Sequence, residues 1–319
     1  MLKKLMECIF CKHSNPIIFI DNYKYELNSD LEYLGDMKIY GCDECGLYFS
    51  QPTPNLDKLD YFYKKIYRKE DRPHYFDQYT KKTSYLDDIN LNYLLYLTTF
   101  IDFNNINTIF DFGAGLGNLG YLIKKNFSHV ELYCCENDEN CVPTLLERGY
   151  KNYQNLESIG KKFDLIISLH CLEHLNNLDP LIKLKELMNP KAYFFFEVPN
   201  CPFENKHMQR IFDSPHLLFF TEKSLKNIFR KIQMRWLNFS FSSYSIDHDF
   251  KNQLSSKQHS QLTIKKKIVV FLKKFQPNYI LNIRRKILKY KLIDKEDKMK
   301  WYVNNQRDSR CLRGILTLK

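Results

Sequence analysis

Between residues 101 and 250 the chain alternates short apolar runs with segments in which apolar residues recur every three or four positions. This alternation is typical of the strands and helices of a mostly parallel α/β sheet. The apolar runs predict buried strands at 107–111, 130–136, 163–169 and 192–200. The periodic segments predict helices that begin after Gly117, at Asn140 and near Asp179.

The flanking segments continue this pattern. Apolar runs at 17–20 and 37–40 predict two short strands, and the stretches 59–66 and 75–100 have helical spacing. Alternating residues at 234–246 and 310–319 predict two further strands. We therefore expect five segments: a small N-terminal module (1–55), a helical cap (56–100), an α/β core (101–250), a helical insertion (251–305) and a final core strand (306–319).

A glycine-rich turn follows the first core strand. Asp111 ends the strand, and glycines then occur at 113, 115 and 117, with Ala114 between the first two. Glycines allow positive φ and let a ligand approach the backbone closely, at what should be a helix N-terminus. The spacing is not that of dinucleotide binders, and no Lys-Ser/Thr pair is present to hold a triphosphate. An acid before the first glycine favours a cationic or amine-bearing ligand.

The next strand ends in a second acid, Glu136, followed by Asn137. A carboxylate there can accept both hydroxyls of a ribose at the carboxyl edge of the sheet. The third core strand leads into His170, Cys171 and a loop that contains His174. Because the carboxyl ends of parallel strands share one edge, these groups should converge on one crevice.

Two Cys-x-x-Cys pairs lie near the N-terminus, 30 residues apart: Cys8 with Cys11, and Cys42 with Cys45. Each pair can present two thiolates, and together they complete a tetrahedral Zn²⁺ site. Four protein ligands predict a structural ion in a small zinc ribbon. The alternative is four free thiols or a redox pair.

The charge distribution distinguishes the C-terminal part of the chain from the rest. Of the net charge of +11, residues 251–319 carry +15 and the remainder carries −4. Two cationic amphipathic helices predicted within 262–293 would suit an anionic membrane surface or a phosphate-bearing substrate. The alternative is a lysine-rich solvent face. Without an apolar leader or a run long enough to span a bilayer, we expect a cytoplasmic protein, with a peripheral membrane location as a further option.

The chain resembles the class I S-adenosylmethionine-dependent methyltransferases, and within them a bacterial branch that has an N-terminal zinc ribbon and includes sugar-modifying enzymes. The matching segments are Asp111–Gly117, Glu136, 163–166, 172–174, 197–200, the Cys42–Phe49 phrase and His216–Thr221. The resemblance implies a Rossmann-like, doubly wound sheet of seven mostly parallel strands, in which 234–246 and 310–319 would pair as the final hairpin. It also implies that Asp111, Gly113, Ala114, Gly115 and Gly117 hold the methionine end of the cofactor, that Glu136 takes the ribose, and that His170 and Cys171 face the cofactor.

Methyl transfer to a hydroxyl requires removal of a proton, and histidine is the usual base near neutral pH. In the zinc-bearing sugar C-methyltransferases a histidine that matches His216 does this work, preceded by Glu where this chain has Pro215. This departure favours methylation of oxygen over carbon. His216 is the first candidate base and His174 the second. For both residues a structural role is the alternative.

The leading hypothesis is a methyltransferase acting on a sugar hydroxyl, free or nucleotide- or lipid-linked, in cell-surface polysaccharide synthesis. An RNA methyltransferase is the first alternative, because a zinc ribbon and a basic tail both suit nucleic acid. The loop after the third core strand, however, reads Leu169-His170-Cys171-Leu172, which is unlike the Asn-Pro-Pro-Tyr of enzymes that methylate base amines. A non-catalytic zinc-ribbon scaffold is the second alternative.

Overall fold

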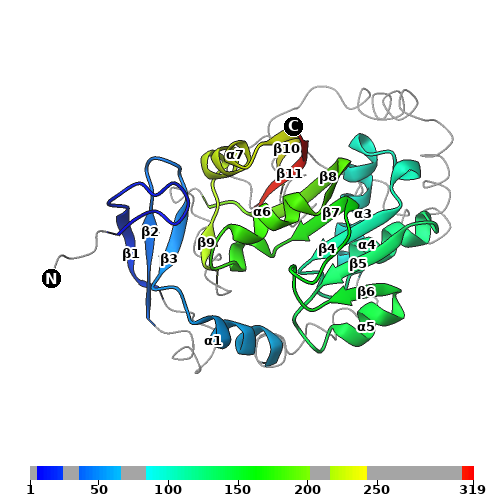
Figure 1. Cartoon of the computed structure of the whole chain (residues 1–319), viewed down its shortest axis with the longest axis horizontal. Helices are drawn as coiled ribbons and strands as arrows, with labels where there is room; N and C mark the ends of the chain where they lie inside the picture. The colour runs from blue at the N-terminus through cyan, green and yellow to red at the C-terminus, as the bar shows by residue number, and fades with distance from the viewer. Residues whose placement is uncertain (1–5, 24–35, 66–83, 202–215, 243–310) are drawn as a thin grey trace, which may run out of the picture.

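The computed structural model describes residues 6–23, 36–65, 84–201, 216–242 and 311–319. Within these ranges the chain forms a four-stranded sheet at its N-terminal end and a seven-stranded sheet flanked by helices (Figure 1). The predicted helices at 262–293 and the first part of the predicted helix at 75–100, residues 75–83, lie outside the described residues. No helix in the described ranges combines the length and the apolar character needed to cross a membrane.

The strands and helices predicted within the described ranges occur in the expected order, and three short strands that the sequence did not predict lie among them, at 48–51, 150–153 and 218–219. The strands are β1 (Ile17–Tyr23), β2 (Met37–Gly41), β3 (Tyr48–Gln51), β4 (Thr108–Phe112), β5 (Glu131–Cys135), β6 (Tyr150–Tyr153), β7 (Phe163–Leu169), β8 (Met188–Pro199), β9 (Leu218–Phe219), β10 (Met234–Ser242) and β11 (Cys311–Leu318). The helices are α1 (Leu56–Tyr61), α3 (Ser84–Phe100), α4 (Asn118–Asn126), α5 (Val142–Glu147), α6 (Asp179–Glu186) and α7 (Glu222–Lys231), with the short 3₁₀ helices η3 (Phe103–Asn105) and η4 (Leu172–His174).

The seven-stranded sheet confirms the predicted fold class. Its strand order is β10-β11-β8-β7-β4-β5-β6, and β4 pairs in parallel with both β5 and β7. The chain runs outward from β4 through β5 to β6 and then returns to β7 on the other side of β4. Such a reversal opens a crevice at the carboxyl ends of the strands.

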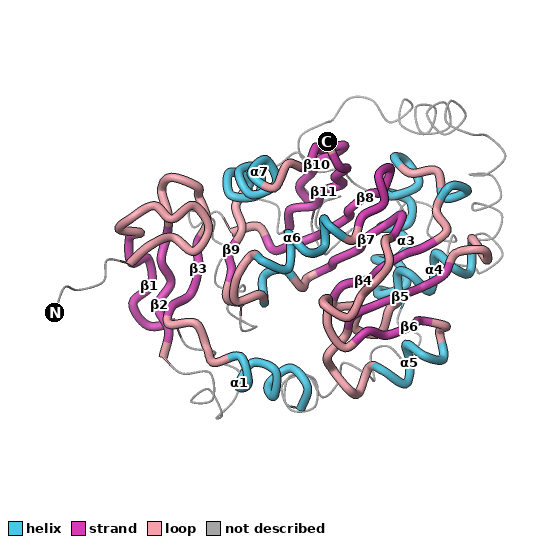
Figure 2. The backbone as a smooth tube through the Cα atoms, viewed as in Figure 1, coloured by secondary structure: helices cyan, strands magenta, loops and turns pink. Residues whose placement is uncertain are grey.

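Helices cover both faces of this sheet (Figure 2). The apolar residues of α3, α4 and α5 pack with one set of strand side chains, and those of α6 and α7 pack with the other set. In β8, Phe194 and Phe196 belong to one core and Phe195 to the other, as the two-residue period of a strand requires. The sheet is therefore doubly wound.

The last strand, β11, occupies an interior position in the sheet. β11 lies between β8 and β10 and is antiparallel to both, so the predicted hairpin of 234–246 with 310–319 is confirmed in the described part. Gly314 permits this fit, because a Cβ there would lie 2.5 Å from the ring of Trp236 and 2.7 Å from that of Phe196.

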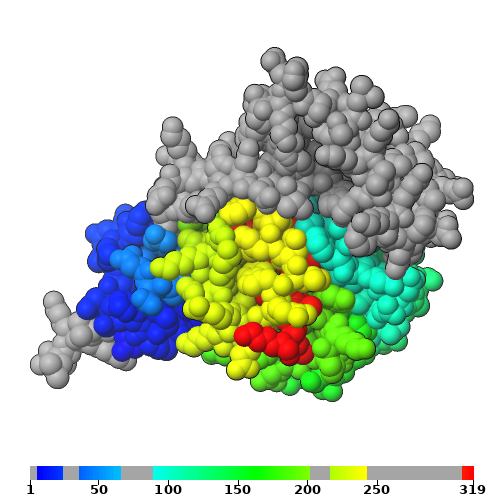
Figure 3. Space-filling view, turned by 90° about the horizontal axis from the view of Figure 1, so that it is seen from above, coloured from blue at the N-terminus to red at the C-terminus, as the bar shows by residue number. Residues whose placement is uncertain are grey.

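The N-terminal sheet is joined to the core through β9. Its order is β1-β2-β3-β9, and β9 comes from residues 218–219. Side chains of α7 and of its N-cap reinforce the contact: Thr221 Oγ1 donates to the carbonyl of Gly46 (2.8 Å), and Lys223 Nζ to that of Asp43 (2.6 Å). Figure 3 shows the blue N-terminal segment side by side with the segment that contains α7. The β3–β9 pairing was not predicted from the sequence.

Candidate functional site

A cavity of about 440 Å³ lies at the carboxyl edge of the seven-stranded sheet. The ends of β4, β5 and β7 form its floor, as the sequence predicts, and α1 with the turn that follows forms its roof. The lining residues are Leu56, Leu59, Asp60, Tyr63, Phe112, Gly113, Cys135, Glu136, Asn137, Asp138, His170, Cys171, His174, Leu175 and Asn176. Six of the predicted site residues therefore line one cavity: Gly113, Glu136, Asn137, His170, Cys171 and His174.

The glycine turn after β4 has the predicted backbone. Gly113, Gly115 and Gly117 have φ values of 71°, 56° and 66°, and Gly117 is the N-cap of α4. A Cβ on Gly113 would lie 2.4 Å from Sγ of Cys171, so this glycine also lets the ends of β4 and β7 approach each other. Among these residues only Gly113 lines the cavity, and the others shape the turn behind it.

Asp111 lies beneath this turn, 5% exposed, and is not part of the cavity lining. Tyr150 Oη donates to the carbonyl of Gly117 (2.9 Å) and lies 3.4 Å from Oδ2 of Asp111. Burial raises the pKa of Asp111 to about 7, and the negative charge of Glu136 adds to this effect. A buried carboxyl with a raised pKa is stabilised in its charged form by a nearby cation.

Glu136 ties the loops of β4 and β5 together. Its Oε2 accepts the N–H of Gly115 (2.5 Å), and its Oε1 accepts that of Asp138 (2.8 Å). Asp138 itself is 2% exposed and accepts the N–H of Asn140 (2.9 Å) in a turn before α5. Sequence reasoning missed Asp138, although Asp-x-Asn after a strand is a turn signal. The cavity wall near the end of β5 thus has an acidic rim, whose loops are joined by hydrogen bonds.

His170 follows β7 in a left-handed conformation (φ 50°), with its side chain 27% exposed. Its Nε2 lies 3.2 Å from Oε1 of Glu197, and its Nδ1 lies 3.5 Å from Oε1 of Glu173. Burial alone would lower the pKa of His170, but the hydrogen bonds with these two carboxylates raise it to about 9. The imidazole is therefore held as a cation between two buried acids.

Glu197 is the centre of a buried network that sequence reasoning missed. Arg313 of β11 donates from Nε to its Oε2 (2.7 Å), and the second hydrogen bond to this oxygen comes from Ser242 (2.6 Å). Tyr93 Oη donates to Oε1 (2.5 Å), and the Arg313 guanidinium lies 4.9 Å and 5.0 Å from the ring centres of Tyr93 and Tyr96. Burial alone would raise the pKa of Glu197, but Arg313 and His170 hold it well below its usual range.

Three further polar residues, Glu173, His174 and His216, lie close together at and beside η4. His174 lines the cavity, and its Nδ1 lies 2.9 Å from the hydroxyl of Tyr63. His216 is 7% exposed and does not line the cavity, but its ring packs edge-on against that of His174 with centroids 4.9 Å apart. The carboxylate of Glu173, 2% exposed, lies beside both rings. The structure thus brings the two predicted base candidates together.

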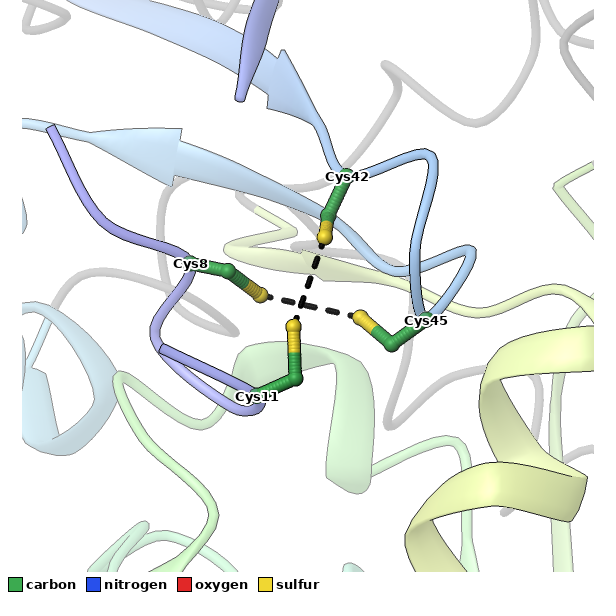
Figure 4. Close-up of side chains that lie close together, drawn as sticks. All are labelled: Cys8, Cys11, Cys42 and Cys45. Atoms are coloured by element: carbon green, nitrogen blue, oxygen red, sulfur yellow. Dashed lines mark hydrogen bonds between the residues drawn. The ribbon is translucent and has the colours of Figure 1, made fainter. Parts of the chain in front are cut away.

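The four N-terminal cysteines form a compact cluster in which the side chains point toward a common centre (Figure 4). Sγ of Cys8 lies 3.6 Å from that of Cys45, and Sγ of Cys11 lies 3.5 Å from that of Cys42. The two turns are alike, because the residue after each pair has a positive φ: Lys12 at 64° and Gly46 at 76°. In each turn the carbonyl of the first cysteine accepts the N–H of that residue.

The comparison with protein families gives a match to "Methyltransferase domain" over residues 70–236, more than half of the chain. Among solved structures, the plantazolicin methyltransferase BamL, in complex with a triazolic desmethylPZN analog and SAH, is similar with a TM-score of 0.50 and 11% identity over 81% of this chain and 93% of that one. A SAM-dependent methyltransferase from Archaeoglobus fulgidus has a TM-score of 0.46 and 15% identity over 76% and 97% of the two chains. No protein of curated function matched.

The similarity to the BamL structure supports the fold, and the family match supports the activity. The matched residues include β4 to β8 and the whole floor of the cavity, so the family assignment and the geometry concern the same part of the molecule. The chain belongs to the methyltransferase-domain family and is an S-adenosylmethionine-dependent methyltransferase.

Proposed function

We propose that this enzyme transfers a methyl group to a hydroxyl oxygen of a small-molecule acceptor, a sugar in free or nucleotide- or lipid-linked form. One observation carries the proposal: a single cavity is lined by Gly113 and Glu136 and also by Tyr63 and His174. The first pair suits a nucleoside cofactor, and the second offers hydroxyl and imidazole groups to a polar acceptor.

The cofactor would occupy the glycine-turn side of this cavity. Its methionine end would lie over Gly113, with its α-amino group favoured by the buried carboxyl of Asp111 beneath the turn. The ribose hydroxyls would be bound by Glu136, whose present contacts to backbone N–H groups hold it at the rim. Asn137 and Cys171 line the cavity beside it and would complete the contact surface.

The acceptor would then lie against Tyr63 and His174. Methyl transfer from a sulfonium is an in-line displacement, so the protein has to hold the acceptor oxygen opposite the leaving sulfur and promote loss of its proton. His174 is the histidine of the pair that reaches the cavity, with His216 packed behind it. We therefore place acceptor activation at this pair, with His174 nearer to the acceptor.

Calorimetric titration with S-adenosylmethionine tests the cofactor half of the proposal. Asp111→Asn and Glu136→Gln should each weaken binding at least roughly tenfold, because each removes a charge-assisted contact. Asp164→Asn is the matched control, because this acid contacts Thr108 at the other end of β4. Unchanged affinity in both test variants would overturn the assignment of the cofactor site.

The acceptor half is tested by incubating the protein and the cofactor with nucleotide sugars and with RNA, and by locating the added methyl group with mass spectrometry. Methylation of a sugar hydroxyl supports the proposal. Methylation of RNA alone, or of a carbon or nitrogen atom of the acceptor, overturns it.

We also propose that Cys8, Cys11, Cys42 and Cys45 hold a structural Zn²⁺. Bonds of about 2.3 Å from a tetrahedral zinc place neighbouring sulfurs ~3.8 Å apart, and the cluster has pairs at 3.5 Å and 3.6 Å. Elemental analysis of the pure protein should give zinc that is lost in Cys11→Ser and retained in His13→Ala, the control at an exposed neighbour. A reduced, folded, zinc-free wild type would overturn this assignment.

A further inference from the structure

We infer that Glu173, His174 and His216 form a second metal site, for a divalent transition-metal ion, in the acceptor-side wall of the cavity. One carboxylate oxygen and one ring nitrogen from each histidine all lie within 4.8 Å of one another. The inference deepens the proposed function and rests on it for its role in catalysis, because the ion would take over from a free imidazole the activation of the acceptor oxygen.

The spacing of the three atoms suits an ion at their centre. An equilateral triangle with sides of 4.8 Å, the upper limit here, places its corners about 2.8 Å from its centre. Shifts of roughly 0.7 Å or less per side chain then give the ~2.1 Å bonds of zinc to nitrogen and oxygen. Small side-chain rotations supply shifts of this size.

The carboxylate of Glu173 has a binding capacity that the protein does not use. The residue is 2% exposed, and its Oε1 faces Nδ1 of His170. Its Oε2 is buried without a hydrogen-bond partner within the described part of the chain. A buried carboxylate oxygen in that condition is costly and rare. A cation between it and the two histidine rings would satisfy it.

The ligands also have the outer contacts that hold metal ligands in place. Tyr63 holds Nδ1 of His174, which makes Nε2 the ligand nitrogen. The main chain is fixed as well: the N–H of Leu217 donates to the carbonyl of Glu173 (2.8 Å), and Tyr23 Oη donates to the carbonyl of His216 (3.0 Å). These bonds join η4 to the segment before β9, so the site is assembled before an ion arrives.

Two imidazoles and one carboxylate select for ions such as Zn²⁺, Fe²⁺, Co²⁺ or Mn²⁺, whereas Mg²⁺ and Ca²⁺ prefer oxygen ligands alone. Because His174 lines the cavity, the ion would lie in its wall. There it would lower the pKa of an acceptor hydroxyl bound to it. The hydroxyl proton passes to solvent, the O–CH₃ bond forms as the S–CH₃ bond breaks, and S-adenosylhomocysteine leaves uncharged.

The test is a metal count on the full chain, saturated with Zn²⁺ or Co²⁺ and freed of excess by gel filtration. We expect two ions per chain in the wild type, one at the four cysteines and one at this site. Glu173→Gln and His216→Gln should retain only the first ion. In the cobalt protein, the absorption bands of a nitrogen and oxygen site should disappear in these variants while the thiolate-to-cobalt bands stay.

Two controls show whether a change in the number of bound metal ions is specific to this site. Glu186→Gln removes a surface carboxylate that pairs with Lys183, and it should leave two ions. Unchanged titration with S-adenosylmethionine shows that the test variants are folded and that the cofactor site is intact. Tyr63→Phe should weaken the second ion by roughly 10- to 100-fold, the usual effect of losing an outer partner.

One ion per chain in the saturated wild type would overturn the inference, and so would two ions that persist in both test variants. If the one-ion protein still methylates a sugar hydroxyl, the proposed function stands and His174 acts as a metal-free base. If two ions bind but no hydroxyl is methylated, the site stands and the proposed function fails.

Discussion

The proposed cofactor side of the cavity consists of residues at the ends of β4, β5 and β7, whereas the proposed acceptor side joins side chains from the turn after α1, from η4 and from the segment before β9. Neighbouring parallel strands bring the first group together directly. The second group depends on the pairing of β3 with β9 and on the packing of Leu59 of α1 in the core of the N-terminal sheet. The cofactor side is therefore a property of the α/β core, and the acceptor side is a property of how the N-terminal sheet is attached to it.

The largest effect should come from removing the N-terminal metal. In Cys11→Ser/Cys42→Ser the two turns would lose the proposed Zn²⁺ that joins them, and β3 would then lose its fixed position beside β9. We expect acceptor methylation to fall roughly 100-fold or more, because structural zinc contributes directly to folding. The affinity for S-adenosylmethionine should change less than about threefold, since the cofactor side does not depend on this sheet. An equal loss of acceptor methylation and of S-adenosylmethionine affinity would contradict the separation of the two sides.

Gly113→Ala should affect the cofactor side and leave the acceptor side intact. Gly113→Ala places a Cβ 2.4 Å from Sγ of Cys171 at a φ of 71°. The strain should weaken S-adenosylmethionine binding roughly 20-fold, as expected for about 2 kcal/mol of backbone and steric cost. Gly160→Ala is the matched control, because a Cβ there meets nothing within 4 Å. Metal content should be unchanged in both variants, and a change in either would contradict the separation of the two sides.

The pH dependence of cofactor binding should reflect Asp111. With its pKa raised to about 7 by burial, the carboxyl is ionised at pH 8 and mostly protonated at pH 6. If the cofactor's α-amino group requires the carboxylate, affinity should fall about tenfold between these values. Asp111→Asn should bind weakly and without this slope, and calorimetry at several pH values measures both.

The stability of the cofactor-free fold should depend on pH with the opposite sign: cofactor affinity rises with pH, whereas the contribution of Asp111 to stability falls. A carboxyl whose pKa is raised on folding favours the folded state when protonated. Its contribution is full below about pH 4 and is lost as the pH rises through 7. Chemical denaturation across this range checks the sign, and a contribution of Asp111 that increases with pH would contradict the burial of an uncompensated carboxyl.

The smallest effect should come from Tyr93→Phe. It removes the hydroxyl that donates to Oε1 of Glu197 and leaves the contacts of Arg313 and Ser242 to Oε2 in place. The free energy of unfolding should fall by about 1–2 kcal/mol, the usual effect of one hydrogen bond to a charged group. Both sides of the cavity should retain their affinities, because Glu197 lies behind His170 and outside the lining. A selective loss on one side would show that the network belongs to that side.

The sequence predicted the parts of this molecule whose residues are close along the chain. Gly113, Gly115 and Gly117 lie within one turn, Glu136 follows the adjacent strand, and each cysteine pair spans four residues. The spacing of these residues along the chain was therefore enough to predict that they lie close together. The strand pattern likewise predicted a mostly parallel α/β sheet, since apolar runs and alternation are local properties, whereas the doubly wound order and the closing hairpin were expected from the family resemblance.

The remaining features depend on contacts between distant residues. Nothing local marks Arg313 as the partner of Glu197, 116 residues away, or Tyr63 as the partner of His174, 111 residues away. His216 and His174 were both predicted as candidate bases, but their edge-on contact follows from the short strand β9, two residues long. Such pairs are decided by packing and pairing across the fold, which hydrophobic periodicity does not report.

The position of β11 also determines when the enzyme can become complete during synthesis. Residues 311–318 occupy an interior place in the sheet and supply the cation that neutralises Glu197. A ribosome adds roughly 5–20 residues per second, so β8 has been made several seconds or more before its partner exists. Until then the nascent chain presents an open sheet edge and a carboxylate without its arginine. A nonsense mutation anywhere before this strand should therefore abolish the fold as well as the activity.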